Sequence, residues 1–525
     1  MRKTVSFIIS VVTIVASMVA VVSAQAPDPG TATSFGAVQN VAGEGEVATF
    51  TQQFYDLDGN SDASRTLENV AFGDTMGLTP NDTVTGAPIV GTLPSGWQGS
   101  SMVSSDQEAA AVVLVQYLNG GIGADGITTA DYLGVGSPGS DNFCASVGKR
   151  DNEDSRIVVM NTSDDPVSDV SISFKDRSGA DVGTPMENIT IAGMAQKTFE
   201  LFDSAFNLPT DFLGSARVQS AGGTPLAVAA VTHWGGAGGA YGTFAYNCQS
   251  TEAAATTLYA PKVQRRIFGG NWFDSTGVIV VNTEATNASV EVEFYERDGT
   301  PGGSFTDTIP GFSARGYNTR YVGNADPTTI NGLIGEGTAD EPNWQGSVVV
   351  TSDSGQELVG VVKQGYDANK WAGGYNMLSD GDAGTDWFFP LTYRRGFNQN
   401  WTDYVGIICQ NVSTSNVAPE VTFKNRLTSV ESSFTDANPF GQYVSHGYNT
   451  RYGGQQAASW FGDTTCGGSG CGNNLADNFI GGAFVSASSD IVCIQETWFE
   501  EVYDGSTWHA GGDANLNNVY GKDLP

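Results

Sequence analysis

The residues of this chain with the most evident chemistry are its six cysteines. An even number of cysteines in an exported protein favours disulfides, although many different pairings are open to six of them. The pairs expected from their positions are Cys409–Cys493, Cys466–Cys471 and Cys144–Cys248. The first would bridge the two sheets of a β-sandwich, as in immunoglobulin-like domains, and the second would close a small loop. Metal binding by Cys466 and Cys471, or an intermolecular bond through Cys144 or Cys248, is the alternative.

An acidic segment places oxygen-bearing side chains at alternate positions, namely Asp56, Asp58, Asn60 and Asp62. Such side chains are the ligands of Ca²⁺, which takes roughly six to eight oxygens. The glycine of this segment is misplaced for an EF-hand loop, and the equivalent turn at Asp298 lacks the other acids. A hairpin turn is therefore the preferred interpretation, with a structural calcium ion as the alternative.

Groups suited to acid–base or nucleophilic catalysis are sparse. The three histidines, His233, His446 and His509, lie in different parts of the chain, and no HExxH or Gly-x-Ser-x-Gly segment accompanies them. Adjacent carboxylates such as Glu500 and Glu501 carry little weight in so acidic a protein. We therefore expect that the protein is not an enzyme and that it needs no catalytic cofactor.

Aromatic side chains and glycosylation sequons indicate contacts with carbohydrate. Trp97 and Trp344 occupy a repeated position that holds phenylalanine in other copies, which assigns them to the core. The better candidates for stacking on sugar rings are Trp371, Trp498 and Trp508. The Asn-x-Ser/Thr sequons lie at Asn81, Asn161, Asn188, Asn287, Asn400 and Asn411. If the source organism glycosylates its surface proteins, these asparagines would be displayed sites.

One short segment recurs four times, at intervals of 115 to 135 residues: 96–105, 211–220, 343–352 and 478–487. A period of this length corresponds to a small domain rather than to a solenoid coil. Each copy also contains a segment with alternating apolar residues, such as Val170, Ile172 and Phe174, which indicates a strand buried on one face. Residue pairs typical of hairpin turns follow this segment in the first three copies, at Gly59, Gly179 and Gly299.

These patterns predict an all-β protein, a tandem array of four immunoglobulin-like antiparallel β-sandwich domains. Glycine- and aspartate-rich stretches place the domains at residues 25–138, 139–255, 256–385 and 386–525. The first copy is abbreviated, because only residues 26–37 precede its first strand signal. One consequence would be a sheet edge left open for a strand from another molecule; the alternative is an extended linker.

The amino terminus predicts export. Residues 1–24 combine Arg2 and Lys3, an apolar stretch and a small-residue cleavage site, so we expect a signal peptide cleaved after Ala24 or Ala26. A retained membrane anchor is the alternative. No later segment is long and apolar enough to cross a membrane. The net charge of −33 makes nucleic acid and anionic lipid improbable partners.

The third copy carries a recognisable series of segments: Tyr-Ala-Pro-Lys-Val at 259–263, Trp272, Val-Val-Asn at 280–282, and Gly-Ser-Val-Val-Val-Thr-Ser at 346–352. This series resembles a repeat in secreted surface proteins of filamentous bacteria such as Chloroflexota. The resemblance implies an envelope, sheath or matrix component and brings no catalytic motif. The abbreviated first copy and the cysteine-bearing insertion in the fourth depart from it.

We therefore expect a secreted, acidic structural protein that forms or decorates an extracellular filament, sheath or surface layer. Its partners would be further copies of itself or other surface proteins. The alternative is an adhesive protein that binds polysaccharide.

Overall fold

The computed structural model of this chain describes residues 10–14, 30–79, 88–119, 128–150, 152–236, 239–268, 271–320, 334, 343–366, 371–397, 400–450, 456–457, 475, 478–503, 508–518 and 520–522. Within these ranges the protein is built from antiparallel β-sheets, in agreement with the predicted all-β class. The helical elements with described bounds are two short 3₁₀ turns, η1 (Ser204–Phe206) and η2 (Thr251–Ala253). The described residues contain no helix that is long and apolar enough to span a membrane.

Three nine-stranded sheets with closely similar strand pairing follow one another along the chain. Repeat 2 contains β10 (Asp141–Arg150), β11 (Glu153–Asn161), β12 (Val167–Asp176), β13 (Met186–Ile191), β14 (Gln196–Glu200), β15 (Phe212–Ser220), β16 (Leu226–Gly236), β17 (Gly239–Asn247) and β18 (Gln249–Ser250). Repeat 3 contains β19 (Thr257–Phe268), β20 (Asn271–Asn282), β21 (Ala288–Glu296), β22 (Pro301–Ile309), β23 (Ala314–Asn318), β24 (Asn343–Ser352), β25 (Leu358–Tyr366), β26 (Trp371–Asn376) and β27 (Leu378–Ser379). Repeat 4 contains β28 (Gly384–Phe397), β29 (Asn400–Asn411), β30 (Glu420–Asn425), β31 (Glu431–Thr435), β32 (Ser445–Asn449), β33 (Gln456–Ala457), β34 (Asn478–Tyr503), β35 (Trp508–Asn518) and β36 (Tyr520–Lys522).

The first part of the chain forms two smaller sheets instead of one large sheet. Repeat 1 contains β2 (Gly30–Asn40), β3 (Val47–Asp56), β4 (Ser61–Ala71), β5 (Thr75–Gly77), β6 (Val90–Gly91), β7 (Gly99–Ser105), β8 (Ala109–Asn119) and β9 (Thr128–Leu133). One sheet has the order β1-β7-β3-β4-β6 and the other β5-β2-β8-β9, with β1 (Ser10–Ile14) lying at the edge of the first. In repeats 2 to 4 the first strand (β10, β19 or β28), which we call the opening strand, pairs with strands of both halves and so joins them into one sheet.

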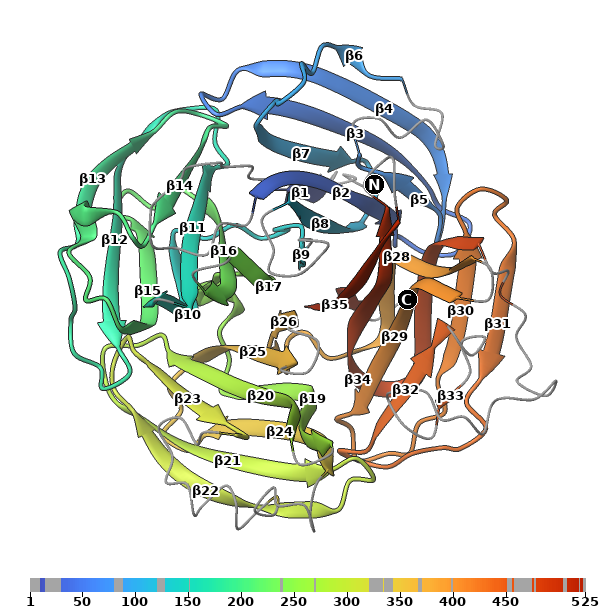
Figure 1. Cartoon of the computed structure of the whole chain (residues 1–525). Helices are drawn as coiled ribbons and strands as arrows, with labels where there is room; N and C mark the ends of the chain where they lie inside the picture. Colours follow the sequence, from blue (N-terminus) through green and yellow to red (C-terminus); the bar gives the residue numbers. More distant parts are fainter. Residues whose placement is uncertain are drawn as a thin grey trace, which may run out of the picture.

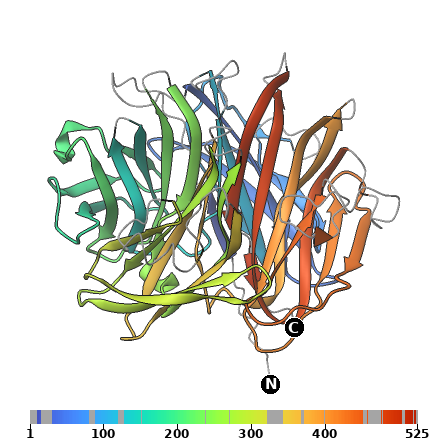
Figure 2. The ribbon, with the colours of Figure 1, turned by 60° about the horizontal axis from the view of Figure 1, so that its bottom comes forward.

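The repeats follow in tandem along the chain, but in space they close into a ring (Figure 1). The strands β9, β17, β26 and β35 lie at its centre, where each packs against the next and β35 packs against β9. The long strands β34 and β35, drawn in red, run between the two faces of the ring (Figure 2). Repeat 1 therefore contacts both repeat 2 and repeat 4, and the chain is not the extended row that four repeats alone suggest.

The apolar cores follow the alternation seen in the sequence. In β12 the buried side chains include Val170, Ile172 and Phe174, and the residues between them are partly exposed. The cores also continue from one repeat into the next: Val231 of repeat 2 packs in the core of repeat 1, and Leu114 of repeat 1 in the core shared by repeats 3 and 4. The ring is thus held by buried apolar side chains as well as by polar contacts.

The fourfold segment found in the sequence is a close approach between two strands. A Cβ added at Gly346 would come within 1.9 Å of the Tyr295 carbonyl oxygen and 2.6 Å of the Trp344 ring, so only glycine fits. The same approach occurs at Gly99, Gly214 and Gly481. In each copy the aromatic ring two residues earlier packs on a phenylalanine: the pairs are Trp97–Phe54, Phe212–Phe174, Trp344–Phe294 and Phe479–Phe423. Trp344 is buried in the core, as predicted, whereas Trp97 is only partly buried.

The glycine-bearing hairpin turns dock each repeat onto its neighbour. Gly59, Gly179 and Gly299 all have positive φ, as the hairpin prediction requires. Gly59 lies against the backbone of Gly193 in repeat 2, and Gly299 lies against Gln442 and Val444 in repeat 4. These turns therefore terminate hairpins and also form the contacts between repeats.

Candidate functional site

The opening strand of a repeat lies beside the strand that carries the repeated glycine. In repeats 2 to 4 the opening strands β10, β19 and β28 pair antiparallel with β15, β24 and β34. Each opening strand contains a register shift and then pairs with the second strand of its repeat, so it belongs to both halves of the sheet. This strand position is the candidate site in repeat 1.

In repeat 1 the opening position is taken by β1. Its backbone pairs antiparallel with β7, with Val12 opposite Val103 and Ile14 opposite Ser101, and it also lies against β8. Ser101 lies two residues after Gly99, just as Ala216 lies two residues after Gly214. Ala216 pairs with Cys144 of the opening strand β10. β1 therefore has the register of an opening strand.

β1 lies within residues 1–24, the predicted signal peptide. Cleavage after Ala24 or Ala26 would remove it and leave one side of β7 without a neighbour. Residues 99–105 contain no charged residue and no proline, which are the usual protections of an exposed sheet edge. In the structure the edge of β7 is paired with β1, so the open edge expected for the abbreviated copy stays a prediction that depends on removal of residues 1–24.

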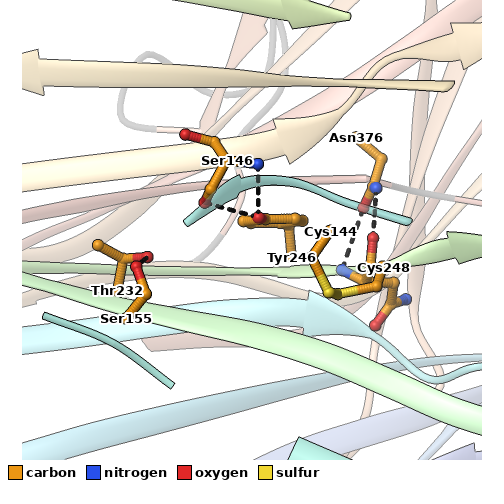
Figure 3. The surroundings of a disulfide bond; sticks show 8 residues. Cys144, Ser146, Ser155, Thr232, Tyr246, Cys248 and Asn376 are labelled. Atoms are coloured by element: carbon orange, nitrogen blue, oxygen red, sulfur yellow. Dashed lines mark hydrogen bonds between the residues drawn. A yellow bond between two sulfur atoms is a disulfide. The ribbon is translucent and has the colours of Figure 1, made fainter. Parts of the chain in front are cut away.

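Two of the predicted disulfides form in the structure, Cys144–Cys248 and Cys409–Cys493. The first ties the opening strand of repeat 2 to the residue between β17 and β18, close to the Tyr246 hydroxyl, which donates to the Ser146 carbonyl at 2.7 Å (Figure 3). The Asn376 amide donates to the Asn247 carbonyl at 2.6 Å and so links this region to repeat 3. Cys466 and Cys471 lie outside the described residues.

The Cys409–Cys493 disulfide does not bridge two sheets, contrary to the prediction. These cysteines are directly opposite each other on the adjacent strands β29 and β34, which belong to one sheet. Both strands are apolar and both belong to the core, which is why their sequences did not distinguish neighbours in one sheet from partners across two.

The acidic segment forms a hairpin turn in which Asp56 accepts hydrogen bonds from the backbone N–H groups of Asp58 (2.9 Å) and Asn60 (2.8 Å). Burial opposes the ionised carboxylate, but the hydrogen bonds from Asn60, Asp58 and Gly59 lower the pKa of Asp56 overall. Asp176 accepts equivalent bonds from Ser178 and Ala180. The described residues contain no group of three or more His, Cys, Asp or Glu side chains placed to hold a metal ion. Calcium at Asp56, Asp58, Asn60 and Asp62 stays a prediction.

Two sequons prove to contain buried asparagines. The Asn161 amide donates to the carbonyls of Asp165 and Ala192 and accepts from Ser163, and the Asn411 amide makes equivalent bonds in repeat 4. Both side chains are fully buried. The same position holds Asn40 in repeat 1 and Asn282 in repeat 3, with the same hydrogen bonds and no sequon. The expectation of displayed glycan sites at Asn161 and Asn411 is thus corrected, because their amides hold the turn after the second strand.

Glycosylation at the other sequons stays a prediction. Asn188 and Asn287 are exposed. Asn400 opens strand β29, and Asn81 lies outside the described residues.

Two of the three tryptophans proposed for sugar stacking lie in strands at the centre of the ring, and the third lies in β34. Trp371 begins β26 and Trp508 begins β35, whereas Trp498 lies inside β34 and pairs with Tyr404 and Ala514. The side chains of these three residues lie outside the described part of the structure, and carbohydrate binding by them stays a prediction.

The two histidines whose side chains are described, His233 and His446, contact polar groups within the fold. His233 is fully buried, its Nδ1 lies 2.9 Å from the Thr243 hydroxyl, and burial lowers its pKa well below the ordinary value. The His446 Nδ1 lies 2.7 Å from Asp436, which also accepts from Tyr448. In repeat 3 the equivalent carboxylate accepts a bond from a tyrosine hydroxyl too, so this arrangement belongs to the repeat. The side chain of His509 lies outside the described part of the structure.

A carboxyl with a strongly shifted pKa lies beside His233. Burial raises the pKa of Asp154 to about 7, against the opposing charge of Arg156, and Glu200 raises it further. The Arg156 Nε lies 3.6 Å from Asp154 and 3.8 Å from Glu200. Because Asp154 is almost completely buried, this group affects the stability of the interior rather than the chemistry of an open pocket.

Buried ion pairs join repeat 3 to both neighbours. Lys363 of repeat 3 contacts Glu153 of repeat 2 at 2.9 Å, and Lys262 of repeat 3 contacts Glu496 of repeat 4 at 2.6 Å. Burial alone would raise the pKa of Glu153, but the Lys363 ammonium outweighs it and the pKa is lowered. Burial lowers the pKa of Lys363, with Glu153 opposing the shift, and we infer an ionised pair. The sequence offered no signal for these pairs, because their members lie in unremarkable strand segments.

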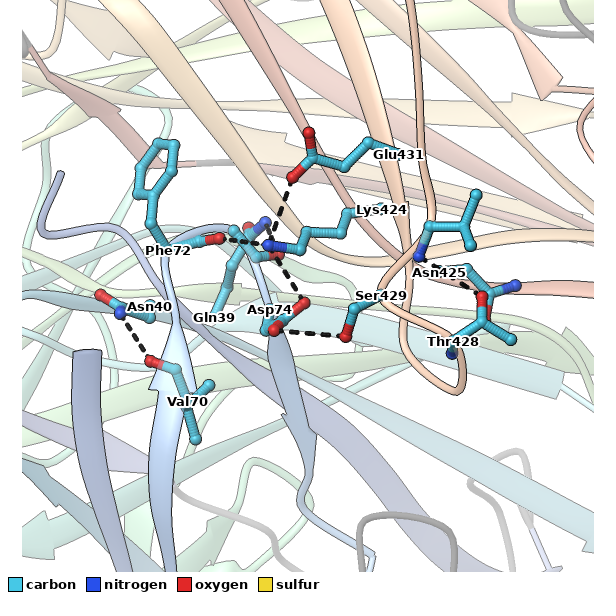
Figure 4. Close-up of polar contacts among 12 residues, drawn as sticks. Gln39, Asn40, Val70, Phe72, Asp74, Lys424, Asn425, Thr428, Ser429 and Glu431 are labelled. Atoms are coloured by element: carbon cyan, nitrogen blue, oxygen red, sulfur yellow. Dashed lines mark hydrogen bonds and ion pairs between the residues drawn. The ribbon is translucent and has the colours of Figure 1, made fainter. Parts of the chain in front are cut away.

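Polar contacts also join repeat 4 to repeat 1, where the ring closes (Figure 4). The Lys424 ammonium of repeat 4 donates to the Phe72 carbonyl of repeat 1 at 2.7 Å and lies 3.3 Å from both Asp74 and Glu431. The Gln39 amide of repeat 1 donates to the Gly73 carbonyl at 3.0 Å. One lysine thus connects the first and last repeats.

Comparison with known proteins leaves the chain without a family. No family model and no curated protein matches it. Among solved structures, the similar chains include the one titled "Crystal Structure of Thermotoga maritima 1070". It aligns at 8% identity with a TM-score of 0.18, over 27% of this chain and 96% of that one. So low a score carries no argument about fold or function.

Proposed function

We propose that the protein is an exported, non-enzymatic structural subunit that forms or decorates an extracellular filament, sheath or surface layer. In this proposal each repeat is an immunoglobulin-like β-sandwich, and four of them form one subunit. The observation that carries the proposal is the edge of β7, whose neighbouring strand lies within the predicted signal peptide. An open strand edge on a compact body is a means of joining subunits.

The opening strands of repeats 2 to 4 occupy their positions in the same chain, so among the described opening positions the processed subunit leaves one unfilled. A single acceptor edge makes the contact between subunits heterologous, and heterologous contacts produce open chains unless a rotation closes them. This favours a filament or sheath over a closed dimer.

The acidic composition fits this role. Without Arg2 and Lys3 the processed chain has 22 basic against 57 acidic residues, a net charge of −35 that keeps free subunits apart, and added cations would reduce that repulsion during assembly. The buried disulfides suit a protein that must persist in an oxidising exterior.

The test is negative-stain electron microscopy of the purified chain beginning at residue 27, with and without Ca²⁺. Ordered polymers are expected, and a matched chain that retains residues 1–26 should stay unassembled. Particles that remain monomeric in all conditions, and that bind polysaccharide on a glycan array, would replace the structural role with the adhesive one.

A further inference from the structure

We propose that the processed chain binds an extended peptide segment of another polypeptide at the edge of β7, antiparallel to it, with apolar residues at the positions that β1 fills with Val12 and Ile14. This inference rests on the proposed function, because it requires export and removal of the leader. It names the chemistry of the segment that completes repeat 1.

The equivalent opening strands define what such a segment must contain. The two positions that face the core hold Leu258 and Ala260 in repeat 3, Trp387 and Phe389 in repeat 4, and Asn142 and Cys144 in repeat 2. All six side chains are buried, and the polar Asn142 is accommodated because its amide donates to the Gly139 carbonyl of the same chain at 2.7 Å. A strand with polar residues at both positions would leave unpaired groups in the core, and an unpaired buried polar group is unfavourable.

The size of the side chain at the second position differs among the repeats. Phe389 lies opposite the small Ala483, Ala260 lies opposite the larger Val348, and Cys144, which is bonded to Cys248, lies opposite the small Ala216. In repeat 1 the partner is Ser101, a small residue, and Ile14 of β1 lies opposite it. A branched residue beside Ser101 thus resembles the Phe389–Ala483 pair of repeat 4, in which a large side chain packs against a small one.

The backbone and charge set further requirements. A strand added to a sheet edge gains its affinity from main-chain hydrogen bonds and its specificity from alternate side chains. The net charge of −33 disfavours a donor segment rich in Asp or Glu. The occupant is therefore a short β-strand without acidic residues, apolar at two alternate positions.

The experiment uses the secreted chain from residue 27 to residue 525 and a synthetic peptide with the sequence of residues 8–16. Mass spectrometry first establishes that the chain lacks residues 10–14, because a retained β1 would fill the edge and overturn the inference. Calorimetric titration should then show binding, with a higher melting temperature in the complex. The matched peptide with Val12→Asp and Ile14→Asp should bind at least about tenfold more weakly.

Cross-linking tests the register. Val11 of β1 lies opposite Ser104, which is partly exposed, so the Ser104→Cys chain should form a disulfide with the Val11→Cys peptide under mild oxidation. Directly opposed residues on adjacent strands support such a bond, as Cys409 and Cys493 do. The Val12→Cys peptide, one residue out of register, is the control, and equal cross-linking of both peptides would overturn the proposed register.

The outcomes separate this inference from the proposed function. Peptide binding by a chain that never polymerises keeps the inference and rejects self-assembly, since the donor strand then belongs to another protein. Polymers that form unchanged in excess peptide, with no peptide bound, keep the structural role and overturn the inference.

Discussion

At the scale of single residues, the asparagine after the second strand of each repeat is the most informative. Asn40, Asn161, Asn282 and Asn411 each donate to backbone carbonyls and accept from a backbone N–H two residues later. The sequence indicated glycan sites at two of these positions, because a sequon records neither burial nor the direction of a side chain.

Replacement of this asparagine should destabilise the fold. Asn282→Ala removes hydrogen bonds to the buried Ile309 carbonyl and to the turn, and should lower the free energy of unfolding by about 1–3 kcal/mol. The matched control is Asn287→Ala, five residues later on the exposed turn, which should have little effect. Equal losses in denaturant unfolding would show that the buried amide has no special role.

Asp154 should make stability depend on pH in an unusual direction. Its pKa of about 7 in the folded chain exceeds the ordinary value of 3.8. Between these two values the folded state holds a proton that the unfolded state has lost, so its contribution to stability falls as the pH rises from about 4 to about 7.

Asp154→Asn retains the shape of the protonated carboxyl and should flatten this dependence, by at most about 1.4 kcal/mol per pH unit. The control is Glu187→Gln, which removes an exposed carboxylate of the same repeat. Melting temperatures at pH 5 and pH 8 measure the difference. An unchanged slope in the Asp154→Asn chain would show that this carboxyl does not titrate in the range stated.

At the scale of elements, the strands follow from local patterns and their lateral partners do not. The alternation at Val170, Ile172 and Phe174 identified a half-buried strand, and the recurrent glycine identified the strand that contains Gly346. The bond between Cys409 and Cys493 was predicted as a pair but placed between the wrong layers. Two buried apolar strands look alike in sequence whether they are neighbours or face each other.

The hairpin turns also show that a local pattern predicts an element but not its contacts with other repeats. Gly299 was expected because a tight turn requires positive φ, but the turn also lies against repeat 4. Gly299→Ala should therefore cost more than Gly355→Ala, since Gly355 has a similar φ and open space around it. Unfolding midpoints of the two variants measure the excess, and equal losses would mean that the turn does not contribute to docking.

At the scale of the whole molecule, the ring uses different chemistry at each junction. Strands β8, β16, β25 and β34 each contact the preceding repeat of the ring. At one aligned position these strands hold Leu114, Val231, Lys363 and Glu496, in repeats 1 to 4 respectively. Leu114 and Val231 pack in the apolar cores of the neighbouring repeats. Lys363 provides the ammonium of one ion pair, and Glu496 provides the carboxylate of the other. Nothing in a single repeat indicates ring closure, which depends on contacts between segments hundreds of residues apart.

The Lys262–Glu496 pair should be costly to break from one side. Glu496→Leu leaves a buried ammonium beside an apolar group and should lower stability by about 3–5 kcal/mol. The double variant Lys262→Met with Glu496→Leu should recover most of that loss, because two apolar side chains need no charged partner. Additive losses in the double-mutant cycle would show that the two side chains are not coupled.

The position of β1 has a consequence for the timing of assembly. In a chain processed as proposed, the leader occupies the β7 edge for as long as it remains attached, so the precursor carries its own inhibitor. Under that proposal the protease that removes the leader would also control assembly, because a single cleavage would expose the edge of β7. Export and assembly would then depend on the same peptide.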